Sequence, residues 1–141
     1  MGLFSKTYDT IDDLFWDQIK DLYDAEHRIA EALPKMAEAA TCPELAAAFK
    51  QHENETRTQI ERLETIFRSF DREPERETCQ ATKGLIAEGS EMISANGDSD
   101  VRDAGLIAAA QRVEHYEMAG YGAARNLAKR CGLNRVAEIL Q

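Results

Sequence analysis

Hydrophobic residues recur at steps of three and four along four stretches of the chain, which is the spacing of one buried helix face. The first stretch covers about residues 10–40, and Pro34 inside it predicts a bend. The second begins at residues 41–44, whose Thr-x-x-Glu spacing resembles a capping box. We expect the third helix to open after Asp71 and Pro74.

The fourth predicted helix follows the Asn-Gly-Asp-Ser break at residues 96–99 and ends at Cys131-Gly132. Residues 135–141 have the pattern of a short fifth helix, and no stretch alternates with a period of two for long enough to form a strand. Four amphipathic helices with short connections predict an all-α, antiparallel four-helix bundle. At 141 residues, we expect residues 1–141 to form a single domain.

The net charge narrows the classes of partner. The chain has 17 basic and 26 acidic residues, giving −9 at neutral pH, so neither nucleic acid nor an anionic membrane surface is expected to bind it. Cys42, Cys79 and Cys131 are isolated and form neither a disulfide framework nor a zinc motif. No apolar stretch approaches the ~20 residues of a membrane span, and the start shows no secretory segment. We therefore expect a cytoplasmic protein.

An internal repeat relates the two halves of the chain at an offset of 62 residues. Residues 45–55 align with residues 107–117, with four of eleven positions identical. The same offset carries Ala25-Glu26 onto Ala87-Glu88. The chain therefore reads as a duplicated helix pair.

The repeat places acidic side chains and one imidazole in a regular set. Each half contributes one glutamate from its first helix and a pair spaced i, i+3 on its second, all on predicted inner faces. The candidate metal ligands are Glu26, His52, Glu55, Glu88, Glu114 and Glu117. Buried carboxylates repel one another unless cations neutralise them, so the set predicts two bridged metal ions. Oxygen-rich ligands favour iron, with manganese as an alternative, over zinc. Glu55 and Glu117 are the expected bridges, and Glu26 and Glu88 the terminal ligands.

A second interpretation needs no metal. The inner carboxylates would then form hydrogen-bonded pairs with raised pKa values in a structural or interaction protein. Tyr23 and Tyr121 lie one helix turn from Glu26 and Glu117, where they would either donate hydrogen bonds to these carboxylates or fill the core. Gln59 also falls on the inner face.

Several runs of the chain resemble the YciE/YciF stress-response family of ferritin-like proteins. They are Asp21-Leu-Tyr-Asp-Ala-Glu26, Ala32-Leu-Pro-Lys-Met36, residues 55–64, Gly84-Leu-Ile-Ala-Glu88, and residues 101–117 with Tyr121-Gly122. The resemblance implies a ferritin-like bundle, a homodimer, a link to bacterial stress and a di-iron role like that of rubrerythrins, with peroxide or oxygen chemistry. Ferritin-like proteins generally carry Glu-x-x-His in the second and fourth helices, whereas here the elements read His52-x-x-Glu55 and Glu114-x-x-Glu117.

Overall fold

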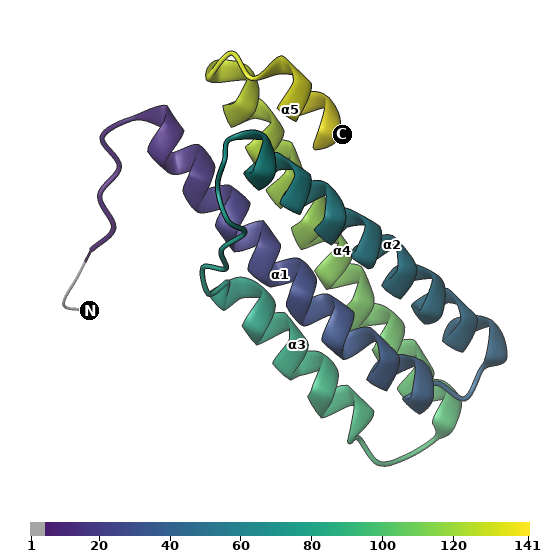
Figure 1. Ribbon diagram of the computed structural model, residues 1–141. Helices are drawn as coiled ribbons and strands as arrows, with labels where there is room; N and C mark the ends of the chain where they lie inside the picture. The colour runs from purple at the N-terminus through teal and green to yellow at the C-terminus, as the bar shows by residue number, and fades with distance from the viewer. Residues whose placement is uncertain (1–4) are drawn as a thin grey trace.

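The computed structural model describes residues 5–141, so the start of the chain lies partly outside it. Within this range every regular element is a helix, in agreement with the all-α prediction (Figure 1). The helices are α1 (Ile11–Ala39), α2 (Pro43–Ser69), α3 (Gln80–Ile93), α4 (Ser99–Arg130) and α5 (Asn134–Ile139). None of these described helices is long and apolar enough to cross a membrane.

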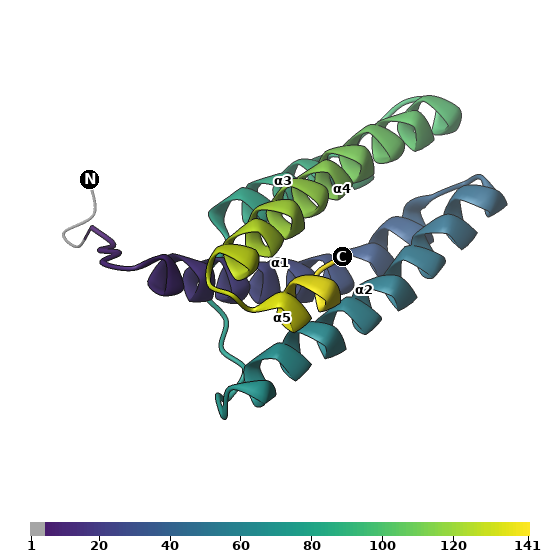
Figure 2. The same cartoon turned by 90° about the horizontal axis from the view of Figure 1, so that it is seen from above.

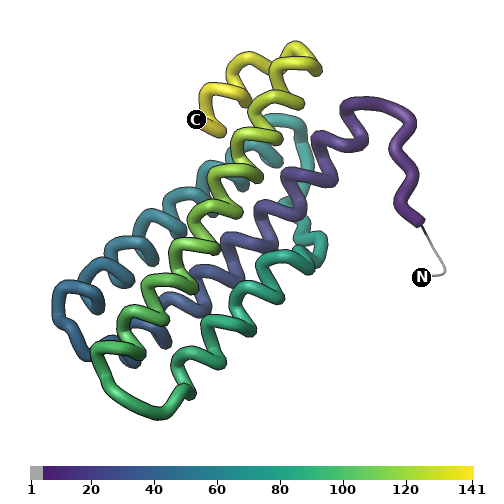
Figure 3. The backbone as a smooth tube through the Cα atoms, turned by 180° about the vertical axis from the view of Figure 1, so that it is seen from behind, coloured from purple at the N-terminus to yellow at the C-terminus, as the bar shows by residue number. Residues whose placement is uncertain are grey.

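The helix α1 is the centre of the bundle and packs against α2, α3 and α4. In the view from behind, α4 lies in front of α1, between α2 and α3 (Figure 3). Figure 2 shows the pair α3–α4 diverging from the pair α1–α2 towards the end that carries the two short interhelical turns. The short helix α5 folds back against α4 and the end of α2. The predicted four-helix bundle with a short carboxyl-terminal helix is therefore confirmed.

The starts of α1 and α2 differ in how they are capped. Thr10 and Asp13 form a reciprocal capping box: Asp13 N donates to Thr10 Oγ1 at 3.1 Å, and Thr10 N donates to Asp13 Oδ2 at 2.9 Å. The helix α1 then continues through Pro34 without interruption. The capping box predicted for α2 is wrong, because its N-cap residue Cys42 makes no side-chain cap hydrogen bond and Pro43 occupies the first helical position.

Asp103 of α4 satisfies the backbone of the α1–α2 turn instead. Its carboxylate accepts hydrogen bonds from Thr41 N at 3.0 and 3.1 Å, from Thr41 Oγ1 at 2.8 Å and from Cys42 N at 2.7 Å. The hydrogen bonds from the Thr41 and Cys42 backbone lower the pKa of Asp103. This carboxylate therefore ties the α1–α2 turn to the first part of α4.

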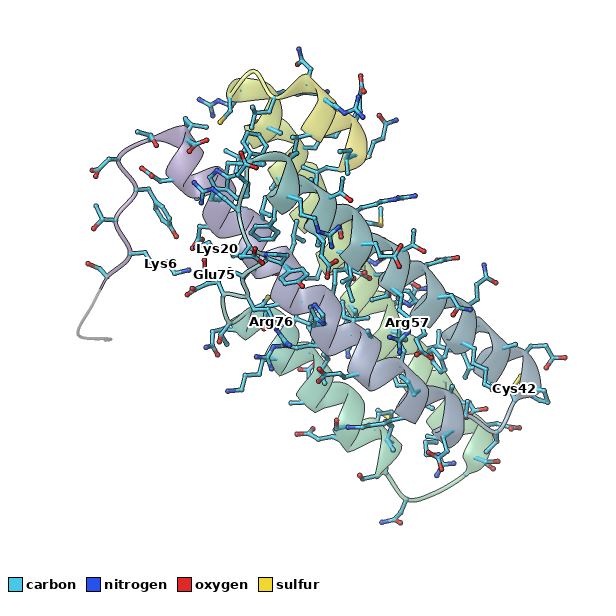
Figure 4. The ribbon with its side chains drawn as sticks, viewed as in Figure 1. Lys6, Lys20, Cys42, Arg57, Glu75 and Arg76 are labelled. Atoms are coloured by element: carbon cyan, nitrogen blue, oxygen red, sulfur yellow. The ribbon has the colours of Figure 1, made fainter. Side chains whose placement is uncertain are left out.

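The connection between α2 and α3 is extended and lies along α1. Lys20 pairs with Glu75 at 2.8 Å, and Arg76 Nε donates to the buried Asp24 at 2.8 Å (Figure 4). Because these contacts hold the residues after Pro74 against α1 outside any helix, α3 starts later than the sequence predicted.

The hydrophobic core is divided into two clusters along the bundle. One contains Phe15, Trp16, Ile19, Leu63 and Phe67 and lies towards α5. The other contains Ile29, Leu33, Met36, Phe49 and Leu106 and lies towards the interhelical turns. Buried polar residues of α1, α2 and α4 occupy the sequence positions between the two clusters, and they form the layer described next.

A buried carboxylate and histidine layer as candidate site

Glu26 of α1, His52 of α2 and Glu117 of α4 meet between the two core clusters. Glu26 is fully buried, Glu117 is 6% exposed and His52 is half-buried. His52 Nε2 lies 3.3 Å from Glu117 Oε2, and Tyr121 Oη donates to Glu26 Oε1 at 2.7 Å. We call Glu26, His52, Glu117 and Tyr121 the polar layer. It brings side chains from three helices into one cluster.

The polar layer holds a proton at neutral pH. Burial raises the pKa of Glu26 to about 9, with the charge of Glu117 adding to the effect and the hydrogen bond from Tyr121 opposing it. Protonation of Glu26 also relieves its repulsion with the Glu117 carboxylate. The hydrogen bond with Glu117 raises the pKa of His52 although burial acts in the opposite direction. Positive charge, whether carried by protons or by another cation, is what this layer requires.

Unsatisfied polar atoms are concentrated at the same level of the bundle. Among the described residues, seven buried side-chain nitrogen or oxygen atoms have no hydrogen-bond donor or acceptor partner. Two of them belong to the polar layer, Glu26 Oε2 and Glu117 Oε1, and two others, Thr56 Oγ1 and Gln59 Oε1, follow His52 on α2 by one and two helix turns. Buried polar atoms are normally paired, so such a concentration indicates a place where a proton, water or ligand completes the set.

A cleft of about 510 Å³ between α2, α4 and α5 leads to the layer. His52, Gln59, Glu117 and Tyr121 line it from α2 and α4, and Leu140 follows α5 at one end. An ion or small molecule therefore has access to the layer without a change in the fold.

Four of the six predicted ligands lie at or beside the polar layer. Three of them, Glu26, His52 and Glu117, are members of the layer. The fourth, Glu114, lies beside it, with its Oε1 atom 3.8 Å from His52 Nδ1. Glu55 also lines the cleft, but it is exposed and accepts a hydrogen bond from Gln51 at 3.0 Å. Its carboxylate thus lies at the rim, away from the bridging position that the repeat predicted.

The structure leaves the sixth predicted ligand, Glu88, outside the layer. Its side chain is 59% exposed, and its nearest basic group is Arg112 at 3.9 Å. The buried face of α3 is centred near Gly89. Since neighbouring residues of a helix point about 100° apart, Glu88 falls at the edge of that face. The repeat therefore equates Glu26 and Glu88 in sequence but not in burial.

The predicted ligands are not arranged as a metal centre. Within residues 5–141, no three His, Cys, Asp or Glu side chains are grouped so that they could hold a metal ion as they stand. A dinuclear centre on all six residues stays a prediction, and the present positions of Glu55 and Glu88 do not support it. Within the polar layer, Glu26 and Glu117 each keep one buried carboxyl oxygen without a hydrogen-bond partner among the described residues.

Some site residues were only partly anticipated by the sequence. Tyr121 donates to Glu26 on α1, rather than to Glu117 on its own helix. Tyr23 donates to Glu64 at 3.1 Å and is not part of the layer. The sequence reasoning missed the fully buried Thr56, although its seven-residue spacing from two buried hydrophobic residues of α2 carried the signal.

Comparisons with known proteins agree with the predicted family. The model of the family described as a domain of unknown function, DUF892, matches residues 10–141, and the chain belongs to this family. The chain is 42% identical over 133 residues to Protein YciF of Escherichia coli strain K12, covering 94% of this chain and 80% of that protein. The crystal structure of the E. coli stress protein YciF superposes with a TM-score of 0.90, at 42% identity, over 94% of this chain and 84% of that one. The YcfI structure from Rhodopseudomonas palustris gives a TM-score of 0.93 at 39% identity, over 98% and 88% of the two chains.

Proposed function

We propose that this member of the stress-protein family binds one divalent cation, iron(II) or manganese(II), through Glu26, His52 and Glu117. The observation that carries the proposal is the pair of buried carboxyl oxygens, Glu26 Oε2 and Glu117 Oε1, which lack a partner among the described residues and lie beside an imidazole. Two carboxylates and one imidazole suit iron or manganese, since oxygen ligands predominate.

The chain's own residues have separate roles in this proposal. Glu26 gives up its proton when a cation takes the place of that proton, and Glu117 supplies the second negative charge. Tyr121 keeps Glu26 oriented through the 2.7 Å hydrogen bond. Glu114, 3.8 Å from His52, helps to orient the imidazole. Bound iron would supply redox reactivity towards peroxide or oxygen, which the cleft admits.

Titration with manganese(II), and with iron(II) under anaerobic conditions, tests the stoichiometry. We expect about one ion per chain, with affinity lowered about tenfold or more in Glu117→Gln and His52→Ala. Glu88→Gln is the matched control, because its side chain is exposed and remote from the layer. Two ions per chain, together with loss of one of them in Glu88→Gln, would restore the six-residue dinuclear centre and contradict the single-ion proposal.

A second candidate function is a metal-free structural bundle. The observation in its favour is the raised pKa of Glu26, about 9, because a proton alone then stabilises the carboxylate pair. In that case neither metal ion nor chelator changes the melting temperature at pH 7.5, whereas the first proposal expects a metal ion to raise it.

We also propose that the chain forms a homodimer through the exposed face of α4. Ile107 and Met118 are 46% and 70% exposed and lie on the same face of this helix, three turns apart. Large exposed apolar side chains on one face favour a protein contact. Light scattering should give twice the chain mass for the wild type and a monomer for Ile107→Glu with Met118→Glu. A monomeric wild type would contradict the proposal.

A further inference from the structure

A second cavity, of about 290 Å³, lies between α1, α3 and α4. It lies in the half of the bundle towards the interhelical turns, because its lining residues on α1 run from Arg28 to Met36. Its walls are largely aliphatic and include Ile29, Leu33, Met36, Ile86, Ile93 and Val113. His52 is the residue that this cavity shares with the cleft above the polar layer. The remaining lining residues of the two sites differ.

Small residues on α3 and α4 keep this cavity open. Gly89, Ala109 and Ala110 all line it. A Cβ atom added to Gly89 would meet only the Cβ of Ala109, at 4.0 Å. Here α3 and α4 therefore carry no side chains large enough to fill the space between them. The cavity exists because these three positions hold glycine and alanine.

The charged residues of the cavity are mainly basic, in a protein of net charge −9. Arg28, Lys35 and Lys83 line it, against the single acidic residue Glu31. Arg28 pairs with Asp24 at 2.6 Å, a carboxylate that it shares with Arg76. Lys35 and Lys83 are exposed, and neither forms an ion pair with any residue in the described range. The two lysines therefore provide unneutralised positive charge beside an aliphatic cavity.

We propose that this cavity binds a single-chain amphiphilic anion, a carboxylate with an alkyl chain of about ten carbons. The aliphatic walls match the chain, and Lys35 and Lys83 match the carboxylate. Since a cavity of about 150 Å³ holds the six carbons of benzene, about 290 Å³ holds about twelve non-hydrogen atoms, the number in decanoate. The proposal does not depend on the proposed cation site, although His52 lines both.

Calorimetric titration with sodium decanoate, below its micellar concentration and with chelator present, tests the proposal. We expect saturable binding of one decanoate per chain. From hexanoate to decanoate the affinity should rise about fourfold per methylene, and it should then level off as the cavity fills. Decanol, which has the same chain without the charge, should bind about fivefold more weakly. Affinity that keeps rising with chain length, or equal binding of decanol, would overturn the proposal.

Two variants and one control locate the ligand. Gly89→Leu places a side chain in the cavity and should abolish decanoate binding, whereas Gly84→Leu adds the same side chain at an exposed position of α3 with nothing within 4 Å and should not. Lys35→Glu with Lys83→Glu should remove the preference for decanoate over decanol and leaves the fold intact, because both side chains are exposed. Unchanged decanoate binding in Gly89→Leu would refute the assignment. An unchanged preference for decanoate over decanol in the double lysine variant would also refute it.

Discussion

The protonation of Glu26 makes a quantitative prediction about stability. In the unfolded chain this carboxyl ionises near its ordinary pKa of 4.5, whereas in the fold it keeps its proton up to about pH 9. Between these values the folded state binds one proton more than the unfolded state. The free energy of unfolding therefore falls as pH rises, by about 1.36 kcal/mol per pH unit. From pH 5.5 to 7.5 the loss is about 2.7 kcal/mol, with chelator present.

The substitution Glu26→Gln isolates this contribution. Glutamine has the shape of the protonated acid, so it can accept from Tyr121 and places no negative charge beside Glu117 at any pH. Compared with the wild type, the variant should therefore lose about 2.7 kcal/mol less between pH 5.5 and 7.5. The raised pKa of His52 acts in the same direction as Glu26, and the pKa of His27, lowered by burial, acts in the opposite direction. The substitution leaves both histidines in place.

Urea denaturation at the two pH values, followed by circular dichroism, measures the effect. Glu55→Gln is the control, since it removes an exposed carboxylate from the rim of the same cleft and should keep the wild-type pH dependence. Equal slopes for the wild type and Glu26→Gln would refute a buried, protonated Glu26. Manganese(II) at about 100 times its dissociation constant should add about 2.7 kcal/mol at pH 7.5 and less at pH 5.5, because protons compete for the ligands.

Three further predictions concern stability. Leu106→Ala should lower the free energy of unfolding in urea by about 2–5 kcal/mol, because the side chain is fully buried, and the adjacent exposed Ile107→Ala should change it by much less. Tyr121→Phe leaves Glu26 Oε1 without its donor and should cost about 1–3 kcal/mol in the same assay. Asp103→Asn keeps the shape of the side chain but removes the negative charge that four hydrogen bonds stabilise. The melting temperature of this variant at pH 7 should therefore be lower than that of the wild type. An unchanged melting temperature would mean that the α1–α2 turn does not need this carboxylate.

The helices and their order could be predicted from the sequence because each has a clear hydrophobic period. The errors lie where a distant residue decides the local structure. The sequence around Thr41 resembles a capping box, but Asp103, from another helix, accepts the hydrogen bonds of this turn. The start of α3 was predicted too early for a similar reason, since Arg76 is held against α1 by Asp24.

The candidate site was predicted in part because burial depends on helix rotation and length. Glu26, His52 and Glu117 were identified from their phase with the hydrophobic residues, and the structure brings them together. The repeat treated Glu88 as the counterpart of Glu26. However, α3 has 14 residues and α1 has 29, so the two helices do not present equivalent faces to the bundle. A match in sequence offset contains no information about that difference.

His52 connects the two proposed sites, because it lines both the cleft above the polar layer and the aliphatic cavity. A cation held by its imidazole would increase the positive potential beside the cavity, so it should strengthen the binding of decanoate. By thermodynamic reciprocity, decanoate must then strengthen the binding of manganese(II) by the same factor, about fivefold for a coupling of 1 kcal/mol. Calorimetric titration of decanoate with and without saturating manganese(II), and the reverse titration, measures both factors. The coupling should disappear in His52→Gln, in which decanoate binding itself is retained. Two unequal factors would show that one of the titrations is not reporting binding to the site assigned to it, and the absence of any effect would mean that the imidazole does not link the two sites.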